Sequence, residues 1–390
     1  MNEIYFDNSA TTPLCNEAKA AMTDVIENIY GNPSSLHSVG LEAEKVLSEA
    51  RSAVMASIGV RGDGRQLIFC GSGSEANNLA TVGVYTSKKR KDGTRVITTA
   101  GEHSSIEAAM SHLEKLGAAV VRLSTSGGRI DFDELASVIT PDTALISVML
   151  VNNETGARYP VEEIFKFAKM HSPDIICHCD AVQAYGKIKF SPKSLGADLI
   201  TVSAHKIHGP KGIAALYVSP EVLKRRALVP IIHGGQQENG LRAGTENTVC
   251  IAGFGAAAKA AIAGFTESNT TAKAVNEHII NRLSTDESLR EIRINRPENA
   301  IPNIINITLP SIKSETMLHF LSRKGILVSS GSACSSHAKS VSRALNAFGL
   351  SDKDADCSLR ISISGYNTTE EADKLCDALA EGLASLIRTK

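Results

Sequence analysis

The sequence of 390 residues has no excess of charge of either sign and no charge block, because 41 Lys and Arg oppose 42 Asp and Glu, for a formal net charge of -1. A nearly neutral chain does not suit a polyanion, so neither a nucleic acid nor an anionic membrane is an expected partner. The sequence also lacks an apolar run of bilayer length. Its most apolar region, residues 251–265, is rich in small residues and contains Lys259, which predicts a packed helix.

The amino terminus lacks the basic segment followed by an apolar segment that marks secretory and transit peptides. There is no C-x-x-C pair, and the eight cysteines have no regular disulfide spacing. We therefore expect a cytoplasmic protein whose thiols are mostly buried and reduced. Cys177 and Cys179 flank His178, but alternation along a strand puts the sulfurs on one face and the imidazole on the other, which favours core packing over a metal site.

Short apolar runs alternate with helical patterns between about residues 60 and 220, and no internal repeat is present. The runs predict strands at Gln66–Cys70, Val96–Thr99, Ala119–Leu123, Ala144–Val151, Ile175–Asp180, Leu199–Ser203 and Ala214–Val218. Apolar spacing predicts helices between them at Glu75–Tyr85, Ser105–Leu116, Phe132–Val138 and Val161–Met170. This order indicates an α/β fold, in which a mostly parallel central sheet has helices on both faces.

The pattern changes after Cys250. An alanine-rich helix to about Ala263 and a polar helix at Thr271–Leu283 precede strand-like segments at Asn303–Leu309 and Leu359–Ser364. A chain of this length exceeds the usual size of a single core, so these segments predict a second, smaller α+β lobe. Ligands of open α/β sheets lie beyond the carboxyl ends of the strands or between lobes. The residues that follow the predicted strands are therefore the first candidates for a site.

The turn at residues 70–78 follows a strand and opens a helix, with Ser74 placed as the predicted N-cap. Backbone N–H groups and the positive helix end, next to Gly73 and Ser74, suit a phosphate. The turn lacks a Walker lysine and a full G-x-G-x-x-G pattern, so a nucleotide is the poorer interpretation. On these residues alone, a turn without a ligand remains an equal alternative.

Two neighbouring predicted strands end in reactive side chains. Asp180 ends one strand, and Lys206 follows the next in Ser-Ala-His-Lys. Pyridoxal phosphate needs an acid at its pyridine nitrogen and a lysine amine that bonds its aldehyde. For either residue alone, a buried ion pair is the simpler interpretation. Their shared position beside a phosphate-type turn favours pyridoxal phosphate.

Two further candidates lie in the C-terminal part. Cys334 lies in a small polar segment, Gly331–His337, where a thiolate could act as a nucleophile, although a single cysteine in such a segment is more often inert. Arg360 begins a predicted strand and could bind a carboxylate through two parallel hydrogen bonds. A surface salt bridge is the alternative for Arg360.

Together these residues make the chain resemble, from end to end, the cysteine desulfurases of the class V aminotransferase family, which are fold-type-I pyridoxal-phosphate enzymes. The segments that carry the resemblance are Tyr5–Pro13, Gly31–His37, Glu102–His103, Val151–Glu154, Asp180–Gln183, Ser203–Lys206, Gly209–Gly212, Arg242–Thr245, Gly331–Cys334 and Leu359–Ser362. The resemblance implies a large cofactor-binding domain at residues 15–258. It also implies a small domain, formed by residues 1–14 and 259–390, that carries the cysteine segment and Arg360.

The resemblance also implies roles for single residues. Lys206 would bond the cofactor aldehyde, Cys334 would accept the sulfur as a persulfide, and Arg360 with Asn153 would bind the substrate. At the cofactor ring, the resemblance implies His103 stacked on the ring and able to move protons, Asn153 and Gln183 at the phenolic oxygen, and Asp180 at the ring nitrogen. At the phosphate it implies Gly73, Ser74, Ser203 and His205, with Thr245 reaching the phosphate from the partner subunit. Either the Lys206 amine or His103 would remove the α-proton.

The implied activity is conversion of L-cysteine to L-alanine with transfer of sulfur through Cys334 to an acceptor, such as an iron-sulfur scaffold protein. The implied unit is a homodimer. No stable metal site is expected; at most Cys334 would hold a nascent iron-sulfur cluster transiently through its persulfide. An aminotransferase, a selenocysteine lyase and a binding protein without catalysis are the alternatives. Four features depart from the family pattern: the order Gly71-Ser72, Ser74 in place of threonine, Val341 in place of proline, and the segment after Ser364.

Overall fold

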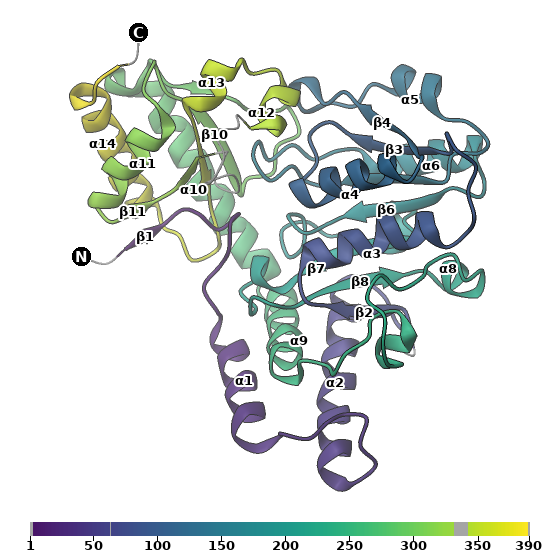
Figure 1. The fold of residues 1–390 in the computed structure, drawn as a ribbon. Coiled ribbons are helices and arrows are strands. Elements are labelled where there is room, and N and C mark those ends of the chain that lie inside the picture. Colours follow the sequence, from purple (N-terminus) through teal and green to yellow (C-terminus); the bar gives the residue numbers. More distant parts are fainter. Residues whose placement is uncertain (1–2, 63, 331–341, 389–390) are drawn as a thin grey trace.

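The computed structural model describes residues 3–62, 64–330 and 342–388 (Figure 1). Cys334 and Val341 lie outside the described residues. A seven-stranded sheet has the order β2-β8-β7-β6-β5-β3-β4. Its strands are β2 (Leu67–Cys70), β3 (Arg95–Thr99), β4 (Ala119–Leu123), β5 (Leu145–Met149), β6 (Ile176–Asp180), β7 (Leu199–Ser203) and β8 (Ala214–Val218). All seven predicted strands are present, so the pattern of apolar runs located the sheet.

The direction of the strands explains where a site can form. β3, β4, β5, β6 and β7 pair in parallel, whereas β8 is antiparallel to both β7 and β2. Two antiparallel steps restore the direction, so β2 also runs parallel to β7. The carboxyl ends of β2, β3, β5, β6 and β7 therefore lie along one edge of the sheet, where α/β folds bind ligands.

Helices cover both faces of this sheet, and each face has its own apolar core. α3 (Gly73–Thr86), α4 (Ser104–Lys115) and the short α8 (Pro220–Lys224) contribute to one core. The opposite core receives α2 (Ser38–Ser57), α5 (Phe132–Val138), α6 (Val161–His171) and α9 (Thr248–Ala263). Adjacent residues of β6 alternate between these cores, as strand geometry requires. The predicted two-faced arrangement is confirmed.

The alternation in β6 also determines which way the side chains of Cys177, His178 and Cys179 point. Cys177 and Cys179 are fully buried in the same core. His178 bonds Ser147 Oγ at 2.8 Å and Thr201 Oγ1 at 3.0 Å. Within the part of the chain that the structure describes, no group of His, Cys, Asp and Glu could hold a metal ion. The prediction of core packing is therefore confirmed for these cysteines.

A second, smaller lobe lies beside the first (Figure 1). Its antiparallel sheet has the order β12-β13-β10-β9, and a separate parallel pair joins β1 to β11. These strands are β1 (Ile4–Tyr5), β9 (Arg293–Ile294), β10 (Ile304–Thr308), β11 (Ile326–Leu327), β12 (Ser329–Ser330) and β13 (Ser358–Ser362). The helices are α10 (Phe265–Thr285), α11 (Ser314–Arg323), α12 (Arg343–Phe348), α13 (Asp352–Asp356) and α14 (Thr369–Ser385). Ile4 and Phe6 pack in the core of this lobe although they begin the chain.

The remaining elements connect or extend the lobes. They are α1 (Asn16–Asn28), α7 (Pro192–Leu195) and the 3-10 turns η1 (Ser126–Gly128), η2 (Ala204–Lys206), η3 (Gln237–Gly240) and η4 (Glu287–Leu289). α9 packs against α1 and α2, and the chain bends by 71° where α10 follows it. No single helix in the described ranges is long and apolar enough to cross a membrane; only α9 and α10 counted together meet that test. Seven residues of α9 are buried, as the prediction of a packed helix requires.

Candidate active site

Asp180 ends β6 and is 5% exposed. Its two oxygens accept hydrogen bonds from different elements: Oδ1 from the backbone N–H of Val182 at 3.0 Å, and Oδ2 from Asn77 Nδ2 at 2.7 Å. These donors hold the carboxylate plane in one orientation at the strand end. A carboxylate fixed there can pair with a cationic nitrogen above the sheet edge, as the sequence predicted for the ring nitrogen.

The phosphate-type turn lies beside the end of β7. A Cβ atom added to Gly73 would lie 3.4 Å from Val182 Cγ2 and 3.8 Å from Ser203 Cβ. Ser203 Oγ is buried and has no hydrogen-bond partner among the described residues. A buried hydroxyl without a partner beside the N-terminus of a 14-residue helix fits an oxyanion, which both groups can bind.

The predicted N-cap at Ser74 is wrong. Ser72 has extended backbone angles, and its Oγ accepts from the N–H of Glu75 at 3.1 Å, so Ser72 is the N-cap of α3. Ser74 lies inside the first turn and is exposed. The helix begins at Gly73, two residues earlier than the sequence suggested, because Ser72 and not Ser74 caps it. Ser74 and Gly73 therefore both lie at the positive helix end that suits an anion.

His103 precedes α4 and caps it, because Nδ1 accepts from the N–H of Ser105 at 3.2 Å. Ser105 Oγ lies 2.8 Å from the same nitrogen. Burial lowers the pKa of His103; Asp180 opposes this shift, and Lys206 and Arg360 add to it. The four side chains therefore act on one another electrostatically, although they come from the turn before α4, from β6, from η2 and from β13.

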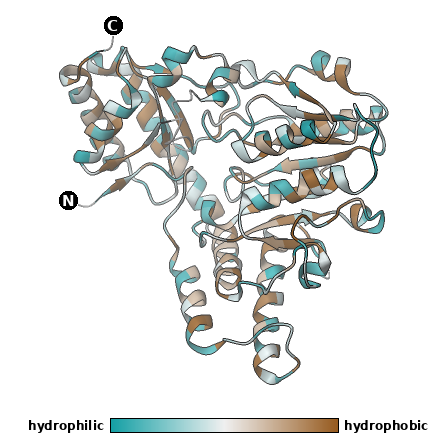
Figure 2. Cartoon of the chain, viewed as in Figure 1, coloured by the Kyte–Doolittle hydropathy of each residue, from teal (hydrophilic) through white to brown (hydrophobic). Residues whose placement is uncertain are grey.

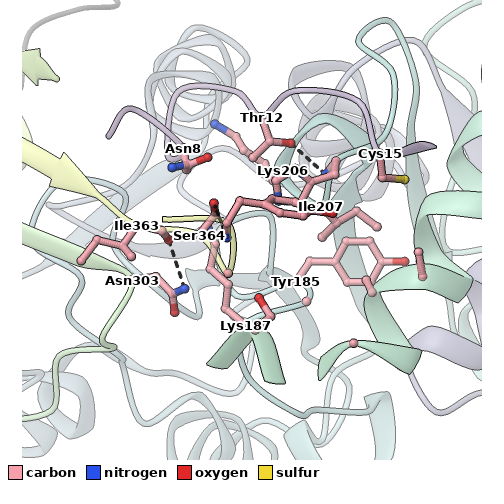
Figure 3. Close-up of a pocket in the computed structure, with 18 of the residues that line it drawn as sticks. Asn8, Thr12, Cys15, Tyr185, Lys187, Lys206, Ile207, Asn303, Ile363 and Ser364 are labelled. Carbon is pink, nitrogen blue, oxygen red and sulfur yellow. Dashed lines mark hydrogen bonds between the residues drawn. The ribbon is translucent and has the colours of Figure 1, made fainter. Parts of the chain in front are cut away.

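Lys206 ends η2, immediately after β7. Its Nζ donates to the carbonyl oxygens of Ser9 and Ala10, the second at 2.9 Å. Gln183 Nε2 donates to the same Ser9 carbonyl at 2.8 Å, and Lys187 Nζ donates to Gln183 Oε1 at 2.9 Å. Lys206 and Lys187 both line a cavity of about 320 Å³ that also borders the small lobe (Figure 3).

Burial, and then nearby positive charge, lower the proton affinity of two bases close to Lys206 in the sequence or the cavity. Burial, and then the charges of Lys206 and Arg360, lower the pKa of Lys187 to about 7. Burial and the neighbouring lysines lower the pKa of His205 to about 3, so its imidazole is neutral at neutral pH. His205 Nδ1 lies 3.3 Å from Thr11 Oγ1. Excess positive charge of this kind suits an anionic ligand.

Arg360 reaches the site from β13 and is 6% exposed. Its terminal nitrogens donate to Asp7 Oδ1 at 2.9 Å and to the backbone carbonyl of Asn153 at 3.0 Å. Arg360 Nε and Asn153 Oδ1 are buried without a hydrogen-bond partner among the described residues. The alternative of a surface salt bridge is therefore wrong, because the guanidinium is buried and joins the two lobes. Burial raises the pKa of Asp7, which Arg360 and Lys206 lower in part.

The described chain thus brings together most of the predicted site residues. Thr245 is exposed and lies three residues after Arg242, whose Nε donates to Glu75 at the start of α3 at 2.9 Å.

Sequence reasoning missed the residues that hold the site, namely Asp7, Asn77, Ser105 and Lys187. Only Lys187 carried a local signal, since it follows Gln183 by four residues and that spacing juxtaposes side chains in a helical turn.

Comparisons with known proteins agree with this geometry. The family model described as aminotransferase class-V matches residues 4–375. The chain is 37% identical to "Cysteine desulfurase IscS" of Dictyoglomus turgidum, over 99% of this chain and 96% of that protein. It is 39% identical to "Cysteine desulfurase 2" of Trichormus variabilis, over 96% and 92% of the two chains.

Solved structures give the same result. A "NIFS-like protein" has a TM-score of 0.90 and 32% identity, over 98% of this chain and 100% of the other. A structure described as SspA in complex with cysteine has a TM-score of 0.80 and 31% identity, over 94% and 100% of the two chains. The chain therefore belongs to the cysteine desulfurases of the aminotransferase class-V family, which are α/β enzymes dependent on pyridoxal 5'-phosphate.

Proposed function

We propose that this chain removes sulfur from L-cysteine, releasing L-alanine and leaving a persulfide on Cys334. The proposal rests mainly on one observation: Lys206, Asp180 and His103 of the large lobe lie close enough to Arg360 of the small lobe to interact electrostatically. A lysine amine, a fixed carboxylate and a buried guanidinium are the groups that cofactor and amino-acid substrate require. The names of the related proteins supply the reaction class.

When bound, pyridoxal phosphate supplies an aldehyde for the amino group and a ring that accepts the electron pair from the α-carbon. Asp180 would keep the ring nitrogen protonated. Gln183 would have to exchange the hydrogen bond of its amide nitrogen to Ser9 for one to the phenolic oxygen. Ser203, His205 and the N-terminus of α3 would hold the phosphate, with Gly73 allowing close approach. The unpartnered Ser203 Oγ is the observation that fits this assignment best.

Arg360 and Asn153 would orient the substrate. The carboxylate would bond the Nε edge of Arg360, which has no other partner among the described residues, while Asp7 and the Asn153 carbonyl hold the remaining nitrogens. Preorganised donors of this kind bind a carboxylate without first being reordered. Cys334, as a thiolate, would then take the substrate sulfur.

The assignment of Lys206 can be tested by trapping. The holoenzyme is reduced with borohydride, digested and examined by mass spectrometry for the cofactor-lysine adduct. We expect the adduct on Lys206, and loss of the visible absorption band in Lys206→Ala. Lys187 lines the same cavity and serves as the matched control. An adduct on Lys187 would show that the site is organised differently.

We further propose that the functional unit is a homodimer. Four large apolar side chains near the end of α1 and the start of α2 are highly exposed: Ile26 66%, Tyr30 84%, Leu36 93% and Leu41 57%. The ribbon at this end of the two helices includes brown, apolar residues (Figure 2). Large apolar side chains exposed at one end of a helix pair favour a protein partner, and the family resemblance implies that a second copy brings Thr245 to the phosphate. We expect Leu36→Asp to convert a dimer to a monomer in light scattering, whereas Leu116→Asp, at a different exposed position, would not. A monomeric wild type would contradict the proposal.

The domain division at residues 15–258, with 1–14 and 259–390 forming the small domain, is also proposed. Its support is that Ile4 and Phe6 share an apolar core with helices and strands that follow residue 271.

We propose that the enzyme acts in the cytoplasm and passes its sulfur to an acceptor protein such as an iron-sulfur scaffold. All seven cysteines among the described residues are free thiols, which suits a reducing compartment.

A further inference from the structure

Two turns at the edge of the large sheet are joined by a pair of hydrogen bonds, and each turn carries a residue of the candidate site. After β3, Glu102 precedes His103. After β5, the neighbouring strand, Asn152 precedes Asn153. Glu102 Oε1 accepts from the backbone N–H of Met149, which ends β5, at 2.8 Å. Asn152 Nδ2 donates back to the carbonyl oxygen of the residue before Glu102 at 2.9 Å, so the two turns are fixed to each other from both sides.

This connection between the turns lies in the interior of the large lobe. Glu102 is 8% exposed and Asn152 is 1% exposed. Thr99, which ends β3, donates from Oγ1 to the same Glu102 oxygen at 2.8 Å. A Cβ atom added to Gly101 would lie 3.2 Å from Tyr159 Oη, so the packing leaves the first turn little space in which to move.

The surroundings of Glu102 favour a neutral carboxylic acid. Its Oε1 accepts two hydrogen bonds, whereas Oε2 is buried and has no partner among the described residues. This asymmetry suits a carbonyl oxygen and a hydroxyl group better than a carboxylate, whose two oxygens both need donors. The charged groups that act on Glu102 most strongly are the acids Asp180 and Glu107, and it also acts on the titratable Tyr159 and Cys179. Burial, and then Asp180, raise the pKa of Glu102 to about 8 against the effect of its two hydrogen bonds.

We infer that Glu102 is a positioning residue: as a neutral acid it holds the turn of His103 to the turn of Asn153, so that these two site residues keep one relative position. The inference rests on the proposed function, in which His103 belongs to the group around the cofactor and Asn153 orients the substrate. No bond to substrate forms or breaks at Glu102. Its ionisation would place a second buried negative charge near Asp180, which the fold stabilises poorly, and would weaken the connection between the turns.

Infrared spectroscopy tests the protonation state without any turnover. A protonated carboxylic acid has a C=O stretching band that lies apart from the bands of carboxylates and amides. We expect this band in the difference spectrum of wild-type holoenzyme minus Glu102→Gln at pH 6, and we expect it to fade as the pH rises through about 8. The matched control, wild type minus Glu163→Gln at an exposed position on α6, should not contain the band. Its absence from the Glu102→Gln difference spectrum at pH 6 would overturn the inference.

The hydrogen bond from Thr99 provides a second spectroscopic test. Thr99→Val keeps the volume of the side chain but removes a donor that favours the carboxylate form of Glu102. We therefore expect the band of Glu102 to persist to a higher pH in Thr99→Val than in the wild type. A band that fades at a lower pH in this variant would contradict the assigned contacts.

Rescue by glutamine tests the positioning role. Glutamine offers Met149 the same acceptor oxygen, whereas leucine offers none. We expect Glu102→Leu to lower kcat for alanine formation from cysteine about 10- to 100-fold, because a misplacement of about 1 Å can cost about 100-fold, and we expect Glu102→Gln to recover at least about tenfold of that loss. Equal losses in the two variants, or no loss in Glu102→Leu, would overturn the inference. A wild type that forms no alanine would refute the proposed function, whereas the infrared band tests Glu102 separately.

Discussion

Replacing Glu154 with glutamine should change how the stability of the protein depends on pH. Glu154 is 7% exposed, and its Oε2 accepts from Ser342 Oγ at 2.6 Å. Burial raises the pKa of this carboxyl to about 7, although Ser342 and Arg360 lower it in part. The unfolded chain should titrate near the ordinary value of 4.5. Glutamine keeps the shape and an acceptor for Ser342 but does not titrate.

The sign follows from proton binding. Because the folded pKa is raised, the stability from this group is fully present below pH 4.5 and is lost as the pH rises through about 7. One pKa unit corresponds to about 1.36 kcal/mol, so a shift from 4.5 to about 7 costs about 3 kcal/mol in total. About 2–3 kcal/mol of this loss in the free energy of unfolding occurs between pH 5 and pH 8, where the wild type and the variant are compared.

The assay is urea unfolding at pH 5, 6, 7 and 8, with the free energy of unfolding of Glu154→Gln compared with that of the wild type. We expect the variant to gain about 2–3 kcal/mol relative to the wild type across that range. Glu163→Gln, at an exposed position on α6, should follow the wild type at every pH. If the curves of Glu154→Gln and the wild type run parallel, the reasoning from burial is refuted.

Two further predictions concern the substrate contact and the phosphate turn. Arg360→Lys replaces a planar guanidinium with a single ammonium. The KM for cysteine, measured from steady-state alanine formation, should therefore rise about 10- to 150-fold, which is the equivalent of one lost charge-assisted hydrogen bond. An unchanged KM would exclude Arg360 from substrate binding. Ser72→Ala should lower the free energy of unfolding by about 1 kcal/mol, and Ser74→Ala by less, because Ser72 caps α3; the reverse order in urea unfolding would contradict the assigned cap.

The sequence predicted the large sheet well because most of its strands are buried on both faces and appear as short apolar runs. It was less accurate where that signal is weak. α10 begins at Phe265 and not at Thr271, since residues 266–271 are all polar and show no apolar period. The start of α3 was also misplaced, because Ser72 and Ser74 are both plausible caps in a sequence and only the backbone angles decide between them.

The candidate site could be predicted in part for a similar reason. Asp180 and Lys206 follow strands, so the rule for parallel sheets places them at one edge. Asn77, Ser105 and Asp7 could not be found this way, because their roles depend on side-chain directions and on how the two lobes pack. A sequence pattern identifies reactive groups at strand ends, whereas the residues that orient them come from elsewhere in the fold.

The central claim is most directly tested by single-turnover reaction of the holoenzyme with cysteine, in which alanine and enzyme-bound persulfide are both followed by mass spectrometry. The wild type should form alanine together with a persulfide on Cys334, and Cys334→Ala should form neither. If Cys334→Ala still forms alanine and an enzyme persulfide, Cys334 is not the sulfur acceptor and the proposed reaction is contradicted.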